Sequence, residues 1–358
     1  MKTLQLRRLQ NGLRAAALGA AGILSAACGG GGDNASLTTD ADREKEAVLE
    51  VKTMIQVSLD ELHDAALDLQ AAAPAPDADG WSAAADAAAV NEMRAQWKRA
   101  RLAYEHVEGA IAVIFPDLDV STDARYDAFI EVSPDDNLFD DTGVTGAHAI
   151  ERVLWSDAMP GSVLAFESAL PGYKAAAFPA SEAEASDFKA KLCARFVADT
   201  KAIRDGFGPL ALDASAAYRG VIGSMAEQVE KINKAATGEE ESRYAQFTLA
   251  DMRANVAAGK ETYAAFQGWL IDKGGAAIDA DILAGFDRID KAYAQIEGDG
   301  LPPVPEGWSS EEPPTDLLES TPFGRLFGVL RTETDPEAPT SLVSAMIKSA
   351  DLLGVDPL

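Results

Sequence analysis

Apolar residues recur every three or four positions along most of the chain, a spacing typical of amphipathic helices rather than of strands. Alanine is abundant and runs of β-branched residues are nearly absent, so the pattern predicts an all-α protein. Helices are expected over residues 42–72, 82–115, 143–157, 181–206, 213–236, 239–273, 279–297 and 340–353.

The mature chain is longer than one hydrophobic core usually serves, and we expect two pseudo-symmetric helical bundles of about four helices each. The first would span residues 42–206 and the second residues 207–358. A faint repeat supports two related halves, because Met93-Arg94-Ala95-Gln96 resembles Met252-Arg253-Ala254-Asn255. The stretch from Gly298 to Pro314, rich in proline, glycine and acidic residues, is predicted to be a long surface connection.

The first 27 residues predict export. Basic residues precede a short apolar run that ends at Ala27-Cys28, as in a lipoprotein signal peptide that is cleaved to leave a lipidated cysteine. The run is too short for a membrane-spanning helix, and a plain signal peptide with an incidental Cys28 is the alternative. Residues 28–41 would form a flexible tether. We therefore expect a lipid-anchored protein of the cell envelope on the periplasmic side. Gly29 lacks the aspartate retention signal, which favours the outer membrane over the inner.

The charge balance narrows the classes of partner. The formal net charge is -27, and removal of residues 1–27 would bring it to about -31 because that segment is basic. Such a protein repels nucleic acid and attracts cations, so no nucleic-acid partner is expected. With Cys28 lipidated, Cys193 has no disulfide partner, and its apolar neighbours predict a buried, inert thiol.

Two helices carry charged residues inside apolar stripes. On the first, Glu108 follows Trp97, Arg101 and Tyr104 along the core-facing stripe, and Glu105 lies beside it. Burying a carboxylate is costly unless a cation or hydrogen bonds compensate. A metal ion could neutralise these carboxylates, and a salt bridge to Arg101 is the alternative interpretation.

The second helix presents His148 and Glu151 on one stripe, where a self-satisfied His–Glu hydrogen bond is the alternative to a metal site. A loop between the two helices carries Asp117, Asp119 and Asp123 and is expected to bring them near the same helix end. Carboxylates and an imidazole converging inside a bundle form an oxygen and nitrogen ligand set suited to iron, zinc or manganese.

These segments resemble the imelysin superfamily, and within it the EfeO/EfeM-type lipoproteins of ferrous-iron uptake. The resemblance is carried by the runs Arg101–Glu108 and Phe115–Arg125, and by Gly146-Ala147-His148-Ala149-Ile150-Glu151, which has the G-x-H-x-x-E signature. Further matching runs begin at Gly238 and Leu301, so the likeness extends over nearly the whole mature chain.

The resemblance implies one metal site, in the first of two pseudo-symmetric bundles. The implied ligands are Glu105, Glu108, Asp123 and His148, with Glu151 as a further ligand or as the residue that orients the imidazole. Iron is the metal most favoured by the resemblance, and zinc is the other candidate. The second bundle is expected to lack ligands, because the internal repeat places non-coordinating residues such as Ala264 at the corresponding positions.

The function that these features favour is a non-enzymatic lipoprotein that captures iron and passes it to an inner-membrane permease. A metallopeptidase is an alternative, since imelysin relatives carry that label, but zinc hydrolases usually have a second histidine within one turn. Here the other two histidines, His63 and His106, lie elsewhere in the sequence. Metal-bridged binding of an anionic polysaccharide is a third possibility.

Overall fold

A computed structural model describes residues 39–82 and 84–356, and within these residues the chain is all-helical with no strand. The predicted signal peptide, the lipidation site Cys28 and nearly all of the tether lie outside the described residues. None of the described helices is long and apolar enough to cross a membrane.

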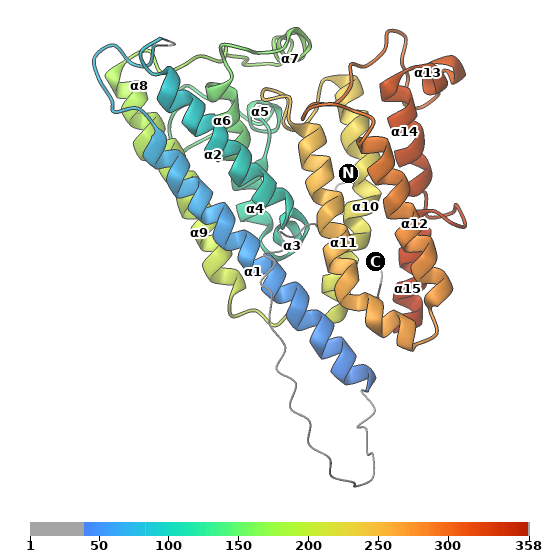
Figure 1. Ribbon diagram of the computed structural model, residues 1–358. Helices are drawn as coiled ribbons and strands as arrows, with labels where there is room; N and C mark the ends of the chain where they lie inside the picture. The colour runs from blue at the N-terminus through green and yellow to red at the C-terminus, as the bar shows by residue number, and fades with distance from the viewer. Residues whose placement is uncertain (1–38, 83, 357–358) are drawn as a thin grey trace.

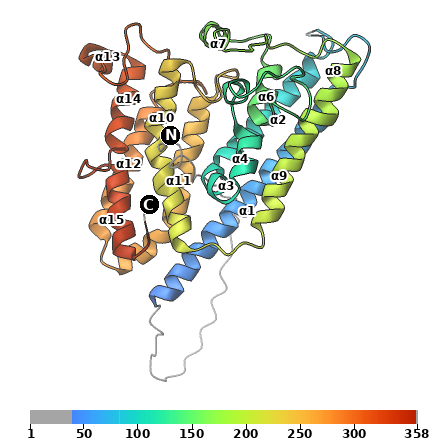
Figure 2. The same cartoon turned by 180° about the vertical axis from the view of Figure 1, so that it is seen from behind.

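The first half of the chain forms one side of the molecule in both views (Figures 1 and 2). Its long helices α1 and α2 pack against each other, and α1 also packs against α9. A short π-helical stretch, Phe188–Leu192, leads into α9. The helices are α1 (Asp40–Ala72), α2 (Ala87–Glu105), α3 (Glu108–Ile114), α4 (Pro116–Asp123), α5 (Tyr126–Ile130), α6 (Gly146–Leu154), α7 (Gly161–Glu167), α8 (Glu182–Asp187) and α9 (Cys193–Phe207).

The second half forms the other side, where α10 packs against α11 and α12 packs against α11 and α15. Its connection to the first half runs between the end of α9 and the start of α10. The helices are α10 (Ala214–Thr237), α11 (Thr248–Asp272), α12 (Ala276–Tyr293), α13 (Thr315–Ser320), α14 (Pro322–Glu333) and α15 (Leu342–Leu353).

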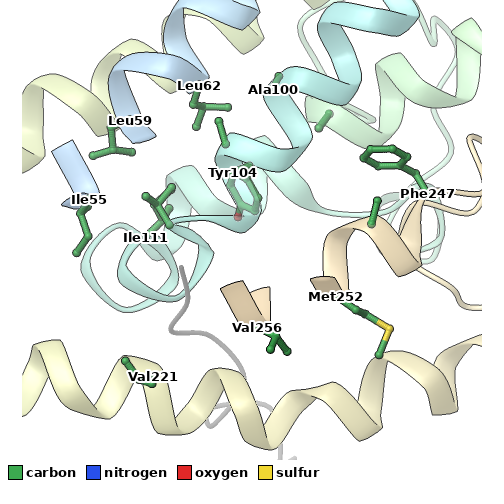
Figure 3. Packing of buried hydrophobic residues seen from close by; sticks show 14 of the residues in the cluster. Ile55, Leu59, Leu62, Ala100, Tyr104, Ile111, Val221, Phe247, Met252 and Val256 are labelled. Atoms are coloured by element: carbon green, nitrogen blue, oxygen red, sulfur yellow. The ribbon is translucent and has the colours of Figure 1, made fainter. Parts of the chain in front are cut away.

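One continuous hydrophobic core joins the two halves. In Figure 3, Leu59 of α1 and Tyr104 of α2 lie on one side of this core, with Val221 of α10 and Val256 of α11 on the other. The first turn of α1 reaches across as well, since Asp40 Oδ1 accepts a hydrogen bond from Trp269 Nε1 at 3.2 Å. The halves are therefore packed together along a broad apolar surface.

Several predicted boundaries were wrong. The helix expected over 82–115 ends at Glu105, and a turn at His106 and Val107 separates α2 from α3. The segment predicted as a loop after Phe115 is helix α4, and the helices between residues 315 and 333 were not predicted. The helix expected from residue 239 begins only at Thr248. As expected, the stretch from Gly298 to Pro314 contains no helix.

Candidate metal centre

The helix break after Glu105 lies where the two halves meet, because α3 packs against α10. A cavity of about 160 Å³ opens there between α3, α4, α6 and α10. Its lining is strongly ionic and comes from both halves of the chain: Glu108, Asp123, Arg125 and His148 from the first, and Glu227, Glu230, Lys231, Lys234 and Glu241 from the second, with Ala124 and Ala128 between them.

The imidazole of His148 is held in one orientation by Glu151. His148 is fully buried, and its Nδ1 lies 2.7 Å from Glu151 Oε2. The other oxygen, Glu151 Oε1, accepts hydrogen bonds from the backbone N–H groups of Tyr244 at 2.9 Å and Ala245 at 2.8 Å. Both oxygens of Glu151 are thus engaged, which favours the orienting role over direct coordination.

The other ring nitrogen of His148 faces the cavity side of the cluster. Its Nε2 lies 3.4 Å from Asp123 Oδ1 and makes no hydrogen bond of good geometry. When Nδ1–H donates to Glu151 and the imidazolium has lost its Nε2 proton, Nε2 carries the lone pair that a metal requires. This is the arrangement of a metal-binding histidine whose second nitrogen is anchored by a carboxylate.

Glu105 and Glu108 lie close together because the turn between α2 and α3 leaves both side chains buried. Between them lies the ammonium group of Lys231 from α10, whose Nζ is 3.1 Å from Glu105 Oε2 and 3.3 Å from Glu108 Oε2. The same Nζ is 2.6 Å from Glu241 Oε2. A protein cation therefore neutralises the pair of glutamates that the sequence assigned to a metal.

Arg101 is the second internal cation. It is almost wholly buried and contacts Glu105 and Asp123, and its Nε lies 3.3 Å from Asp251 Oδ2. The ion pair between Arg101 and Glu105 confirms the alternative interpretation of a salt bridge. Among the described residues, no three histidine, cysteine, aspartate or glutamate side chains already form a metal-binding group. With the carboxylates facing Arg101 and Lys231, a metal would have to enter by rearranging them.

The predicted residues therefore gather in one cluster but do not share one role. Glu108, Asp123 and His148 line the cavity, whereas Glu105 and Glu151 lie behind it. Two residues of the predicted loop do not join them: Asp117 is exposed, and Asp119 accepts a hydrogen bond from Tyr104 Oη within the first half. The expectation that the aspartates come near the same helix end holds for Asp123 and for the buried Asp119, which contacts Tyr104 near the end of α2, whereas Asp117 is exposed on α4.

The segment between α10 and α11 closes one side of the cluster. It begins at Gly238, which ends α10 in a left-handed conformation, and Arg243 within it is fully buried. Arg243 Nη2 donates to Asp127 Oδ1 at 2.5 Å and to Glu167 Oε1 at 3.3 Å. These ion pairs lie on the same non-helical segment as the backbone N–H groups that hold Glu151, and the helix expected from residue 239 begins only after it, at Thr248.

The second half contributes more residues to the cavity than were predicted from the sequence. Lys231, Glu241 and Glu227 were not predicted as site residues, yet all three line the cavity. A signal for Lys231 exists, since it follows Met225 and Gln228 on the buried face of α10. Its partners could not be read from the sequence, because Glu105 lies 126 positions away along the chain.

The pKa values of the cluster reflect this crowding. Burial and Arg101 disfavour the charged form of His148, but the neighbouring carboxylates of Asp123 and Glu151 outweigh them and raise its pKa to about 9. Burial raises the pKa of Glu108 to about 7 despite the nearby ammonium of Lys231. Burial also raises the pKa of the Cys193 thiol, which is fully buried as predicted.

We expect the metal-free protein to lose stability as the pH rises from about 6.5 to 9. The raised pKa of His148 makes its proton stabilise the fold fully below the ordinary pKa of 6.5, and this contribution disappears as the pH passes 9. Ionisation of the buried Glu108 acts in the same direction above its ordinary pKa of 4.5. The loss should be on the order of 2–3 kcal/mol in the free energy of unfolding, measured by urea titration.

A His148→Gln variant should show a flatter pH dependence above pH 6.5. His63→Gln is the matched control, because burial lowers the pKa of His63 and its contribution to stability is lost on acidification instead. Stability that rises between pH 6.5 and 9 would contradict the hydrogen bonding described for His148.

The donors present suit the metal implied by the resemblance. Of the implied ligands, two carboxylates and one imidazole line the cavity; they are oxygen and nitrogen ligands for iron, zinc or manganese, and soft thiolate ligands are absent from the lining. The family model for imelysin, peptidase M75, matches residues 55–316, which include every residue of the cluster. The chain belongs to the imelysin family. No curated protein matches it.

The match to the imelysin family model confirms the superfamily that was predicted from the G-x-H-x-x-E run. The structure confirms the predicted all-α fold within the described residues. The glycine of that run has a steric role here. Gly146 has φ +87, and a Cβ there would lie 2.5 Å from the carbonyl oxygen of Thr122 and 2.6 Å from that of Ser121. In this imelysin domain the glycine therefore lets α6 approach α4 closely enough for His148 to reach Asp123.

Proposed function

We propose that this imelysin domain binds a metal cation, iron in the first place and zinc in the second, in the cavity beside His148. The observation that carries the proposal is the geometry of His148. Its ring is anchored through Nδ1 by Glu151, while Nε2, without a good hydrogen bond, lies at a buried cavity lined by carboxylates. A structural His–Glu pair has no need of a polar cavity at the other nitrogen.

Within the predicted ligand set, the roles divide by position. Glu108, Asp123 and His148 are the proposed ligands, because they line the cavity. Glu105 would support them from behind, and Glu151 would orient the imidazole. This division keeps every predicted residue in the centre while reducing the direct protein ligands to three, which leaves positions for water or a further carboxylate.

The biological role that we propose is capture of iron at the cell envelope. The resemblance to EfeO/EfeM-type lipoproteins favours a protein anchored through Cys28 on the periplasmic side, in the outer membrane rather than the inner, that passes the metal to an iron permease. The net charge of -27 supports the capture step, because an acidic surface raises the local concentration of cations.

The family model also carries the name peptidase M75, so a metallopeptidase is the alternative function. A hydrolase needs a general base beside the metal-bound water, and the motif carboxylate Glu151 has both oxygens engaged. No second histidine approaches the cavity, because His63 Nδ1 pairs with Thr200 and His106 lines a separate groove between α1 and α2. These contacts favour binding without catalysis.

The test is a metal titration of the purified, metal-free protein with Fe(II) under anaerobic conditions and, separately, with Zn(II). Calorimetry and metal analysis should give one metal per chain. His148→Ala should weaken binding by at least about a hundredfold. His106→Ala is the control, because His106 lies outside the cavity. Binding that is absent, or unchanged in His148→Ala, would show the cluster to be purely structural, and cleavage of a general peptide substrate would favour the hydrolase.

A further inference from the structure

Lys231 lies among several buried carboxylates. Only 2% of its surface is exposed, and its Nζ lies within 3.3 Å of carboxylate oxygens from Glu105, Glu108 and Glu241. Three buried carboxylates around one ammonium group form a binding position for a cation, and in this protein the side chain of Lys231 occupies it.

A metal bound to the proposed ligands would compete with this ammonium group. Glu108 belongs to both sets, because it lies 3.3 Å from Lys231 Nζ and also lines the cavity with Asp123 and His148. Two positive charges a few ångströms apart in a buried site repel each other strongly. Since Glu108 cannot serve both cations, a metal can bind fully only if the ammonium group moves away.

A second position for the ammonium group lies one turn earlier on the same helix. Glu227 is four residues before Lys231 on α10, and its side chain lines the same cavity. Its Oε1 is buried without a hydrogen-bond partner, which is costly unless a partner arrives in another state. A glutamate four residues before a lysine on a helix is well placed to pair with it.

We propose that Lys231 is a built-in competitor, which the incoming metal displaces from Glu105, Glu108 and Glu241 onto Glu227. This inference rests on the proposed function. The metal-free cluster stays neutralised by the lysine, and the site's affinity is set by exchange of one cation for another. Monovalent ions gain nothing by such an exchange, so the device favours cations of higher charge. Lys231, which belongs to the second half, therefore influences the affinity of the ligands in the first half for the metal.

The test compares Zn(II) affinity, measured by calorimetry on the purified metal-free protein, in Lys231→Met and Lys234→Met. Lys234 is the matched control, because it lines the same cavity and contacts Glu241 at 2.9 Å and Glu230 at 3.3 Å, but forms no ion pair with Glu105 or Glu108. Lys231→Met should bind Zn(II) about tenfold more tightly than the unaltered protein, and Lys234→Met should change it less than about threefold. Equal gains would mean a general charge effect and would overturn the proposal.

Lys231→Met leaves buried carboxylates unpaired and can fail to fold, so Lys231→Arg serves as a second variant. It keeps the positive charge, and its planar guanidinium makes paired hydrogen bonds to carboxylates that are harder to displace. Lys231→Arg should bind Zn(II) about tenfold more weakly. Unchanged or tighter binding in a folded Lys231→Arg protein would overturn the displacement.

Glu227→Gln separates an acceptor for the lysine from a metal ligand. In the unaltered background it should weaken Zn(II) binding by about fivefold, because the displaced ammonium group loses its partner, whereas in the Lys231→Met background it should have almost no effect. Equal losses in both backgrounds would make Glu227 a ligand and overturn the displacement. Absence of metal binding in every variant would instead refute the proposed function itself.

Discussion

Arg101→Met is expected to lower the free energy of unfolding by about 3–5 kcal/mol. Arg101 is 1% exposed and contacts carboxylates of Glu105, Asp123 and Asp251. Methionine fills a similar volume but leaves these carboxylates without the cation that compensates their burial. Chemical unfolding of the metal-free protein at neutral pH measures the change.

Arg99→Met on the same helix is the control. Arg99 also pairs with two carboxylates, those of Glu61 and Asp68, but all three side chains are at least one-third exposed. Exposed ion pairs contribute at most about 1 kcal/mol, so this variant should be nearly as stable as the unaltered protein. Similar small losses in both variants would show that Arg101 is not needed to compensate the cluster.

The cluster could be predicted from the sequence only where its contacts are local. The spacing of Arg101 and Glu105 along one helix indicated their contact, and the spacing of His148 and Glu151 indicated theirs. Lys231 and Glu241 were missed because Lys231 reaches the site through the packing of α10 on α3, and Glu241 reaches it from the segment that follows α10. Periodicity reports which face of a helix is buried and does not report which distant helix covers it.

The fold was predictable to a similar extent. Long helices such as α1 and α11 gave several turns of periodicity, and their existence was predicted correctly, although α11 begins later than expected. Short helices such as α5 and α13, of five and six residues, present too few turns for a pattern. Their stability comes from tertiary packing rather than from local preference.

The break between α2 and α3 had no sequence signal either. The two residues between α2 and α3 are His106 and Val107, so neither proline nor glycine stands at the break. The apolar stripe continues past it through Glu108 to Ile111. In the structure Val107 is fully buried, and the turn leaves Glu105 and Glu108 on either side of Lys231. The interruption is consistent with buried charge pairing overriding a locally favourable helix, as is common at functional sites.

Gly146→Ala is expected to lower the free energy of unfolding by at least about 2 kcal/mol and to weaken metal binding at the same time. The glycine has φ +87, which disfavours any side chain, and an added Cβ would lie 2.5 Å from the backbone oxygen of Thr122. Relief of this clash requires α6 to move away from α4. That movement would separate His148 from Asp123, which now lie 3.4 Å apart.

Gly161→Ala, at the start of α7, is the matched control, because nothing lies within 4 Å of the position of its added Cβ. It should change stability by less than about 0.5 kcal/mol and leave Zn(II) binding unaltered. Loss of stability in Gly146→Ala with full Zn(II) affinity would mean that the approach of α6 to α4 is needed for the fold alone. Loss of both would give each position of the motif a distinct physical role, in which Gly146 permits the close approach, His148 donates its lone pair and Glu151 orients the imidazole.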